Sequence, residues 1–123
     1  MKSALCAASL ALAFCLSAQA HEVETGAVMI CDTQKQVERL GELFEGKPEV
    51  AIGAVNLEEN DPNACGVAHV AYVQGKLLST VRSKSQAFHV IPIIVVGVNT
   101  PFGLRPVDSA VFFALVKVEE HSV

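Results

Sequence analysis

The fold of this chain is decided by one apolar stretch, which reads Phe88-His89-Val90-Ile91-Pro92-Ile93-Ile94-Val95-Val96-Gly97-Val98. It is the longest apolar run after residue 20, and most of its side chains are β-branched. Such side chains lose rotamer freedom in a helix and pack well on a pleated sheet, so the stretch predicts a strand. Pro92 has no N–H to give to a strand ladder, which indicates a sheet edge or a bulge within the run.

Further strands are predicted on both sides of this run. Gly75-Lys76 separates two segments of apolar alternation, which predicts a tight turn and an antiparallel hairpin. Apolar runs bounded by turn-forming residues predict the remaining strands. The further strands are expected at residues 23–30, 67–74, 77–82 and 107–118.

A helix is predicted over residues 33–45. Thr33 and Gln36 have the spacing of a capping box, in which each side chain binds the backbone N–H of the other residue. Apolar residues then recur on one face at helical spacing, and Gly46 ends the pattern.

A second, shorter helix is predicted over residues 48–56, because its proline suits the first turn of a helix. Its buried side chains are expected to be Val50, Ala54 and Val55. The same residues also alternate as they would in a strand, so a strand is the competing interpretation. The acidic residues in 57–63 then predict a loop.

These elements predict an α+β fold with the order β-α-α-β-β-β-β. The sheet is expected to be curved and antiparallel, with four to five strands, and to be covered by the N-terminal helical segment. The chain after residue 20 is long enough for one domain and too short for two, so residues 21–123 are expected to form a single globular domain.

The first twenty residues have the pattern of a signal peptide. A basic start at Lys2 precedes an apolar run, and Ala18-Gln19-Ala20 is a small-x-small site of the kind that signal peptidase cuts. Cleavage would leave His21 as the first residue of an exported protein. The apolar run is short for a membrane span of roughly 20 residues, so no stable insertion is expected after cleavage.

One cysteine pair, Cys31 and Cys65, remains after residues 1–20 are removed, because Cys6 and Cys15 leave with the signal. An even pair in an oxidising compartment predicts a disulfide. Such a bond would pin the helical segment to the sheet. Two buried free thiols are the alternative.

Charge argues against two classes of partner. The full chain has 13 acidic and 9 basic residues, and loss of Lys2 with the signal leaves a net charge of −5 with the histidines neutral. An acidic surface without a cluster of Lys or Arg is unfavourable for binding nucleic acid or anionic lipid. A partner of either kind is therefore not expected.

Four segments carry a resemblance to known proteins: Cys31-Asp32-Thr33, Gln36-Val37-Glu38-Arg39, Val55-Asn56 and Asp61-Pro62-Asn63-Ala64-Cys65-Gly66-Val67. They resemble a family of small exported proteins with one cysteine pair that is common in rhizobia-type alphaproteobacteria. The likeness runs over most of the chain after residue 20. It implies a bacterial periplasmic address and brings no catalytic activity with it.

A histidine at the mature N-terminus, His21, would offer both its α-amine and its ring to one Cu(II) ion. A second ring would have to come from His69, His89 or His121, and none of these has ligand spacing to another. His69 and His89 fall in predicted strands, and pairing of those strands could bring the two rings together. The plainer interpretation of each is a hydrogen-bonded structural histidine.

The segment before the last strand, residues 99–106, is predicted to be a loop that two prolines make stiff. It carries Phe102, Leu104 and Arg105, which are side chains of the kind that anchor a protein partner. The sequence favours the other interpretation of this segment, in which Phe102 and Leu104 fold back as a lid on the end of the sheet.

No nucleophile–base pair and no metal cluster is visible in the sequence. The sequence therefore favours a non-enzymatic periplasmic binding or accessory protein, which contacts an envelope protein and uses no cofactor. An exported copper-binding protein that uses His21 is the alternative.

Overall fold

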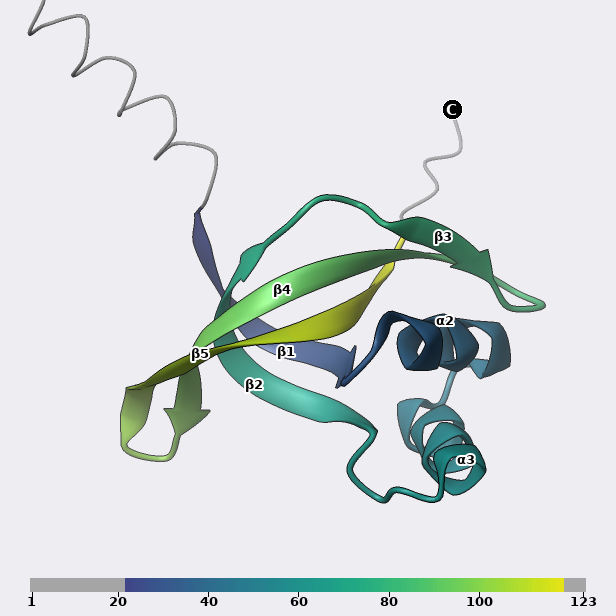
Figure 1. Ribbon diagram of the computed structural model, residues 1–123, viewed down its shortest axis with the longest axis horizontal. Helices are drawn as coiled ribbons and strands as arrows, with labels where there is room; N and C mark the ends of the chain where they lie inside the picture. Colours follow the sequence, from purple (N-terminus) through teal and green to yellow (C-terminus); the bar gives the residue numbers. More distant parts are fainter. Residues whose placement is uncertain (1–21, 119–123) are drawn as a thin grey trace, which may run out of the picture.

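The computed structural model describes residues 22–118. Within them the chain forms a five-stranded antiparallel sheet and two helices in the predicted order, so the α+β prediction is confirmed (Figure 1). The predicted signal peptide, residues 1–20, lies outside the described residues. The elements are β1 (Val23–Cys31), α2 (Gln34–Leu43), α3 (Pro48–Glu59), β2 (Cys65–Gln74), β3 (Ser79–Arg82), β4 (Ala87–Thr100) and β5 (Gly103–Lys117).

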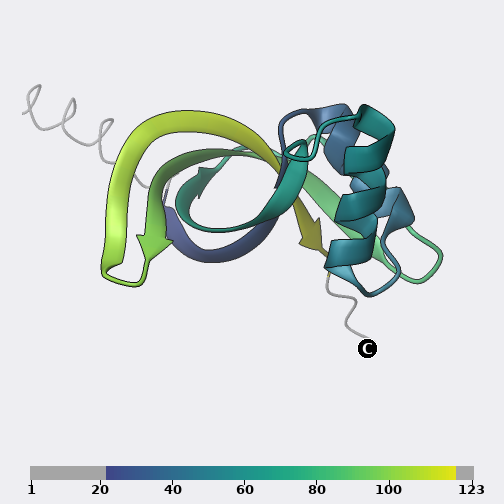
Figure 2. The ribbon, with the colours of Figure 1, turned by 90° about the horizontal axis from the view of Figure 1, so that it is seen from below.

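β4 is the strand on which the sheet is assembled. One edge of β4 pairs with β5 from Phe88 to Thr100. The other edge pairs first with β3, up to Val90, and then with β2, from Ile93 onward. β2 also pairs with β1, and β1 crosses β5 over three residue pairs, so four strands close into a strongly curled ring (Figure 2).

Pro92 is accommodated where β4 changes partner. The C=O groups of Val90 and Pro92 accept hydrogen bonds from the N–H groups of Leu78 and Gly75, at 2.9 and 2.8 Å, so both residues direct their polar groups away from β5. The missing N–H of Pro92 thus falls between the β3 and β2 ladders, where no strand pairing requires it. The expectation of a sheet edge is wrong, because β4 is an interior strand. The alternative of a bulge within the run is confirmed, because the β4–β5 register shifts between Val95 and Gly97.

The predicted hairpin at Gly75-Lys76 is not formed. β2 and β3 use the same edge of β4 one after the other, so they follow each other along that edge instead of pairing. Gly75 is needed for close approach, since a Cβ atom there would lie 2.9 Å from Cγ of Pro92. The glycine marks backbone packing against β4 rather than a tight turn.

α2 begins as its sequence predicts. The backbone N–H of Gln36 donates to Oγ1 of Thr33 at 3.2 Å, and the N–H of Thr33 donates to Oε1 of Gln36 at 3.0 Å, which completes the capping box. Val37 and Leu40 are fully buried against the sheet. The cap therefore fixes the start of the helix that supplies much of the core.

α3 is a helix, so the competing strand interpretation is wrong. It runs on to Glu59, and Asn60 ends it in a left-handed conformation, which makes the acidic loop shorter than predicted. Its buried side chains are Ala51 and Val55. The predicted burial of Val50 is wrong, because that side chain is 62% exposed.

The core is divided between the two faces of the sheet. Alternate residues of a strand point to opposite faces, and in β1 Met29 packs towards the helices while Val28 and Ile30 pack inside the ring. The helices thus cover one face at one end of the sheet. The helix-side core consists of Cys31, Val37, Leu40, Phe44, Ala51, Val55, Cys65, Phe88, Val90 and Leu115, and the ring-side core of Val70, Tyr72, Ile93, Val95 and Ala114.

Cys31 and Cys65 form the predicted disulfide, with their Sγ atoms 2.00 Å apart. They lie opposite each other at the end of the β1–β2 ladder, and the next residues are joined by a hydrogen bond from the N–H of Asp32 to the C=O of Ala64. Hydrogen-bonded and open pairs alternate in an antiparallel ladder, so the cysteines occupy an open pair, in which Cα atoms approach most closely. Their Cα atoms are 4.0 Å apart.

Asn56 of α3 holds the chain at the same point. Its Nδ2 atom donates to the C=O groups of Pro62 and Cys65, at 2.9 and 3.1 Å, and its Oδ1 atom accepts from the N–H of Cys65 at 2.8 Å. The connection from α3 to β2 is therefore fixed by one side-chain amide as well as by the disulfide.

Replacing both cysteines, Cys31→Ser with Cys65→Ser, should lower the free energy of unfolding by about 3–4 kcal/mol by the chain-entropy model. The bond closes a loop between residues 34 apart in sequence, which restricts the unfolded chain. Chemical denaturation of the oxidised wild type, the reduced wild type and the double variant measures the change. An unfolding midpoint that does not move on reduction would contradict the architectural role of the bond.

Candidate functional site

β4 and β5 form a hairpin at the end of the sheet opposite the helices (Figures 1 and 2). The pairing continues to Thr100 opposite Gly103, so the predicted loop over residues 99–106 is wrong: the turn consists of Pro101 and Phe102 alone. Oγ1 of Thr100 accepts from the N–H of Phe102 at 3.2 Å and donates to the C=O of Gly103 at 2.7 Å. Gly103 has φ +111°, a conformation that favours glycine and lets β5 start at once.

Phe102 lies at the tip of this hairpin, where its side chain is 95% exposed. The favoured interpretation, in which it folds back as a lid, is therefore wrong for Phe102. Leu104 is 52% exposed and lines an open cavity of about 300 Å³ at the end of the sheet, with Thr25, Gly26, His69, Val70 and Asn99. Leu104 therefore partly covers the end of the sheet, as the lid interpretation predicts, whereas Phe102 does not.

Exposed apolar side chains continue down both strands of the hairpin. On β4 and β5 respectively, Ile94 lies directly opposite Val111. Single exposed apolar residues are ordinary on protein surfaces, but several on one hairpin make it a candidate contact surface. They lie on both faces of the hairpin, because Leu104 is opposite Asn99 whereas the neighbouring Val98 is opposite Arg105. We call the group the hairpin strip, and it consists of Ile94, Val98, Phe102, Leu104, Val107 and Val111.

The outer edge of β5 has features that discourage the pairing of another strand. β1 pairs with β5 only at residues 113–115, so among the described residues 103–112 have no strand partner on that edge. Pro106 lacks an N–H, and the exposed Arg105 and Asp108 place charges along the same stretch. Proline and charge on an edge strand hinder edge-to-edge association. The hairpin is therefore suited to contacts through its side chains rather than to strand addition.

The two histidines of the predicted strands are not brought together. His69 lies opposite Ala27 of β1, whereas His89 lies opposite Thr80 of β3 and Val116 of β5. In the β2–β4 register Val70 lies opposite Val98 and Gln74 lies opposite Ile93. His69 is therefore beyond one end of this ladder and His89 beyond the other. No group of three or more His, Cys, Asp or Glu side chains within residues 22–118 could hold a metal ion, and His21 lies outside that range.

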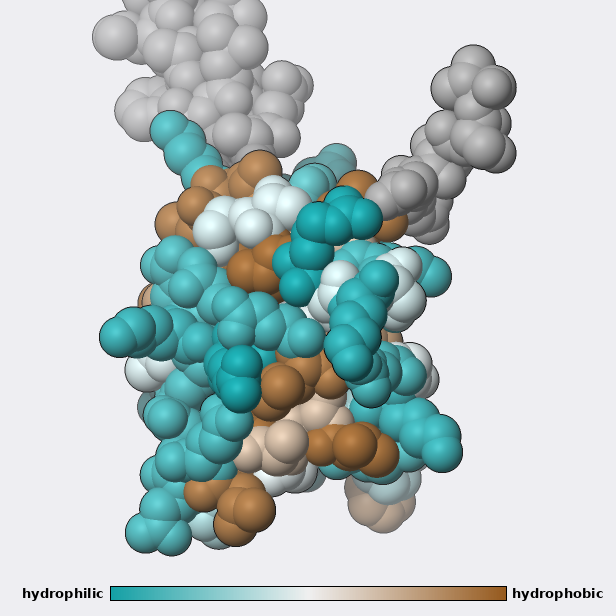
Figure 3. All heavy atoms as spheres, turned by 90° about the vertical axis from the view of Figure 1, so that its right-hand side faces the viewer, coloured by the Kyte–Doolittle hydropathy of each residue, from teal (hydrophilic) through white to brown (hydrophobic). Residues whose placement is uncertain are grey.

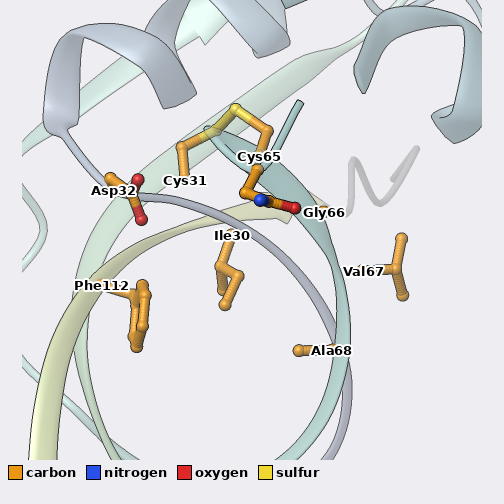
Figure 4. Close-up of a pocket in the computed structure, with 9 residues that line it drawn as sticks. Ile30, Cys31, Asp32, Cys65, Gly66, Val67, Ala68 and Phe112 are labelled. Carbon is orange, nitrogen blue, oxygen red and sulfur yellow. A yellow bond between two sulfur atoms is a disulfide. The ribbon is translucent and has the colours of Figure 1, made fainter. Parts of the chain in front are cut away.

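A small cavity lies beside the disulfide (Figure 4). It measures about 200 Å³, and its lining includes Ile30 and Phe112 as well as the carboxylate of Asp32. Binding sites for small molecules usually measure about 300–1,000 Å³, so this space is small for a substrate. Cys31 and Cys65 are themselves 1% and 6% exposed, which fits a structural bond rather than a reactive one.

A polar cavity between α2 and α3 contains an ion pair that sequence reasoning missed. Arg39 donates to Glu58 of α3 through Nε and Nη2, both at 3.0 Å, and to Glu42 at 3.2 Å. These hydrogen bonds lower the pKa of the Glu58 carboxyl and raise the pKa of Arg39. The partners are separated by 19 residues in sequence, so no local spacing reveals them. The ion pair between Arg39 and Glu58 therefore joins the two helices.

Comparison of the chain with protein-family models, with curated proteins and with solved structures finds no match in any of the three. Among the helices of residues 22–118, none has the length and apolar character needed to cross a membrane.

Glu38 of α2 provides a test of the contact between the helices and the sheet. Its carboxylate accepts from Oγ of Ser79 at 2.6 Å and from Nε2 of Gln34 at 3.1 Å. The Ser79 hydroxyl, followed by the Gln34 amide, holds the pKa of Glu38 below its ordinary value of 4.5. Folding lowers this pKa, so the ionised carboxylate of Glu38 stabilises the folded protein. This stabilisation is fully present above the pKa that Glu38 has in the unfolded chain, and it is lost as the pH falls through the pKa that Glu38 has in the folded protein.

Ser79→Ala should therefore raise the pKa of Glu38 towards its ordinary value and destabilise the protein at neutral pH but not in acid. A carbon-detected NMR titration of the Glu38 carboxyl measures its pKa. Chemical denaturation at neutral pH and in acid measures the change in stability. Thr80→Ala is the matched control, because the exposed Thr80 does not contact Glu38 through a hydrogen bond. Equal titration curves for Glu38 in the wild type and in Ser79→Ala would refute the assignment.

Proposed function

We propose that the protein is a non-enzymatic binding or accessory protein of the bacterial periplasm or the extracellular space, which acts through protein–protein contact at the β4–β5 hairpin. The observation that carries the proposal is the exposure of the hairpin strip, with Phe102 95% exposed at its tip. A large aromatic side chain held in water has a favourable hydrophobic contribution to offer a partner.

The composition of the hairpin supports contact with a protein. Aromatic and arginine side chains dominate the energetics of protein interfaces. Phe102 in the turn and Arg105 near the start of β5 provide one of each. Leu104, two residues from Phe102 and 52% exposed, adds apolar surface near the tip.

The rigidity of the hairpin supports the same proposal. A flexible loop loses conformational entropy when it binds, and this loss reduces the affinity. Here the strands are already paired up to the two-residue turn, and Thr100 fixes the turn with two hydrogen bonds. A preformed contact surface therefore loses little entropy when a partner docks.

The expected partner is a protein of the cell envelope. The signal-peptide pattern of residues 1–20 and the resemblance to exported rhizobial proteins both favour that compartment. The acidic chain disfavours nucleic acid and anionic lipid as partners. The copper-binding alternative depends on His21, and no observation within residues 22–118 adds support to it, so we do not propose it as a second function.

Phe102→Ala should weaken the complex with the envelope partner by about 2 kcal/mol or more, because it removes the central anchor. The melting temperature should change by less than about 2 °C, since substitution of an exposed side chain rarely alters folding stability. A photo-crosslinking residue at position 102 in living cells identifies the partner, and calorimetry with that purified partner then measures the affinity.

Leu77→Ala is the matched control, because Leu77 is also apolar and 52% exposed but lies outside the hairpin. It should leave the affinity unchanged. The proposal fails if a partner crosslinked at position 102 binds Phe102→Ala as tightly as the wild type. It also fails if crosslinking at position 102 captures no protein while crosslinking at position 77 does.

A further inference from the structure

The ring of strands is not filled by side chains at its disulfide end. Side chains on the ring side of β2 become smaller towards the disulfide, in the order Tyr72, Val70, Ala68 and Gly66. Gly66 lies opposite Ile30, which packs inside the ring, so a side chain at position 66 would point the same way. A Cβ atom added at Gly66 meets nothing within 4 Å. The missing side chain of Gly66 thus helps to leave open the cavity of about 200 Å³ beside the disulfide.

This cavity has an apolar floor and a charged mouth. Ile30, Ala68 and Phe112 line it, and all three pack against the ring-side core. Asp32 lines it as well and is exposed to solvent. Figure 4 shows the side chains of Ile30, Asp32 and Phe112 directed towards a common space below the disulfide bond. A ligand that matches this lining has an apolar part for the floor and a cation for the mouth.

The charge around Asp32 favours a cation. Among residues 22–118, no Lys or Arg side chain forms an ion pair with its carboxylate. Residues 32–61 contain eight acidic and three basic residues, a net charge of −5, which equals the net charge of the whole chain after residue 20. This segment includes both helices, and Figure 3, which faces the helical side, shows mainly hydrophilic surface there. A surface of one charge sign raises the local concentration of the opposite ion.

The size and the polarity of the cavity define the ligand further. Its 200 Å³ is small for a drug-sized molecule but holds roughly six groups the size of a water molecule, at about 30 Å³ each. A lysine side chain of a protein partner would enter with its ammonium group first, which places the charge against the apolar floor. A short free amine can enter with its tail first and keep its ammonium group at Asp32. The cavity therefore favours the free amine.

We propose that this cavity binds a small primary amine in its ammonium form. An apolar tail of about five carbon atoms contacts Phe112 and the rest of the floor, and the ammonium group donates to the Asp32 carboxylate. For a ligand of about six non-hydrogen atoms we expect a dissociation constant on the order of 0.1–1 mM. The site is independent of the proposed function, because it lies at the disulfide end of the sheet and includes no residue of the hairpin strip.

Titration of the purified, ¹⁵N-labelled exported protein with n-pentylammonium chloride tests the proposal. The backbone amide signals of Ile30, Gly66 and Ala68 should shift along one saturation curve. n-Pentanol has a similar tail but no charge, so it should bind at least about ten-fold more weakly. Nα-acetyl-lysine methylamide carries its ammonium group at the far end of its chain, and it should also bind at least about ten-fold more weakly.

Two variants change the charge and the space separately. Asp32→Asn keeps the shape of the side chain and should raise the dissociation constant for n-pentylammonium at least about ten-fold. Gly66→Val should fill the cavity and abolish saturable binding while Asp32 remains, and the φ of Gly66 is not positive, so valine is tolerated there. Asp108→Asn is the matched control, because Asp108 is exposed on β5 outside the cavity, and it should bind as the wild type does. Melting temperatures check that each variant is folded.

The proposal is overturned if the wild type shows no saturable shift up to about 10 mM n-pentylammonium, ten times above the expected range. It is also overturned if n-pentanol or the lysine derivative binds as tightly as the amine. Wild-type affinity in a folded Asp32→Asn variant would refute the role of the carboxylate, and wild-type affinity in a folded Gly66→Val variant would refute the location. None of these results bears on the binding of an envelope partner to the hairpin.

Discussion

β4 pairs with β5 along one edge and offers its other edge to β3 and then to β2, and the rest of the structure depends on this ladder. Because β2 is paired with the distal half of β4, its other edge is free to pair with β1. β1 in turn reaches β5 only at residues 113–115, and the four strands close. The part of β5 before that crossing has β4 as its sole strand neighbour within the described residues, which is why the hairpin extends from the ring with its apolar side chains exposed.

The other end of the molecule is fixed by several different interactions. The disulfide joins the strand before α2 to the strand after α3, and Asn56 binds the same backbone through three hydrogen bonds. Arg39 connects the two helices, and Ser79 connects α2 to β3 through Glu38. A small domain buries a limited core, so such links add stability and stiffness. A stiff body with a preformed hairpin is well suited to a binding role that needs no conformational change.

Local signals in the sequence predicted the parts of the fold that depend on local interactions. Thr33 and Gln36 identify the start of α2, because a capping box is made within four residues. The β-branched run identifies β4 for a similar reason. The pairing of β2 with β4 in place of β3 could not be predicted, because it depends on which strand occupies an edge and not on the sequence of the turn. In the sequence Gly75 has the pattern of a turn residue, but in the structure it allows close packing against Pro92.

The candidate site was also predicted only in part, because only some of its residues stand out in the local sequence. Phe102, Leu104 and Arg105 stand out because they are partner-binding residue types beside two prolines. Ile94 and Val98 were missed, because β4 is apolar on both faces and its sequence does not distinguish the buried side from the exposed one. The exposed side of α3, which lies outside this site, was missed as well, since Val50 has the character of a core residue and only the packing of Ala51 and Val55 reveals which side is buried.

Hydrogen–deuterium exchange tests most directly whether the β4 ladder holds a preformed hairpin that a partner covers. In the protein alone, amides of β4 from residue 88 to residue 95 should exchange slowest, and those of residues 103–110 should exchange faster while remaining protected relative to an unfolded peptide. Addition of the crosslinked envelope partner should slow exchange at residues 97–107 and leave the helices unchanged. Unprotected amides in the free hairpin, or protection by the partner at the helices instead, would contradict this description.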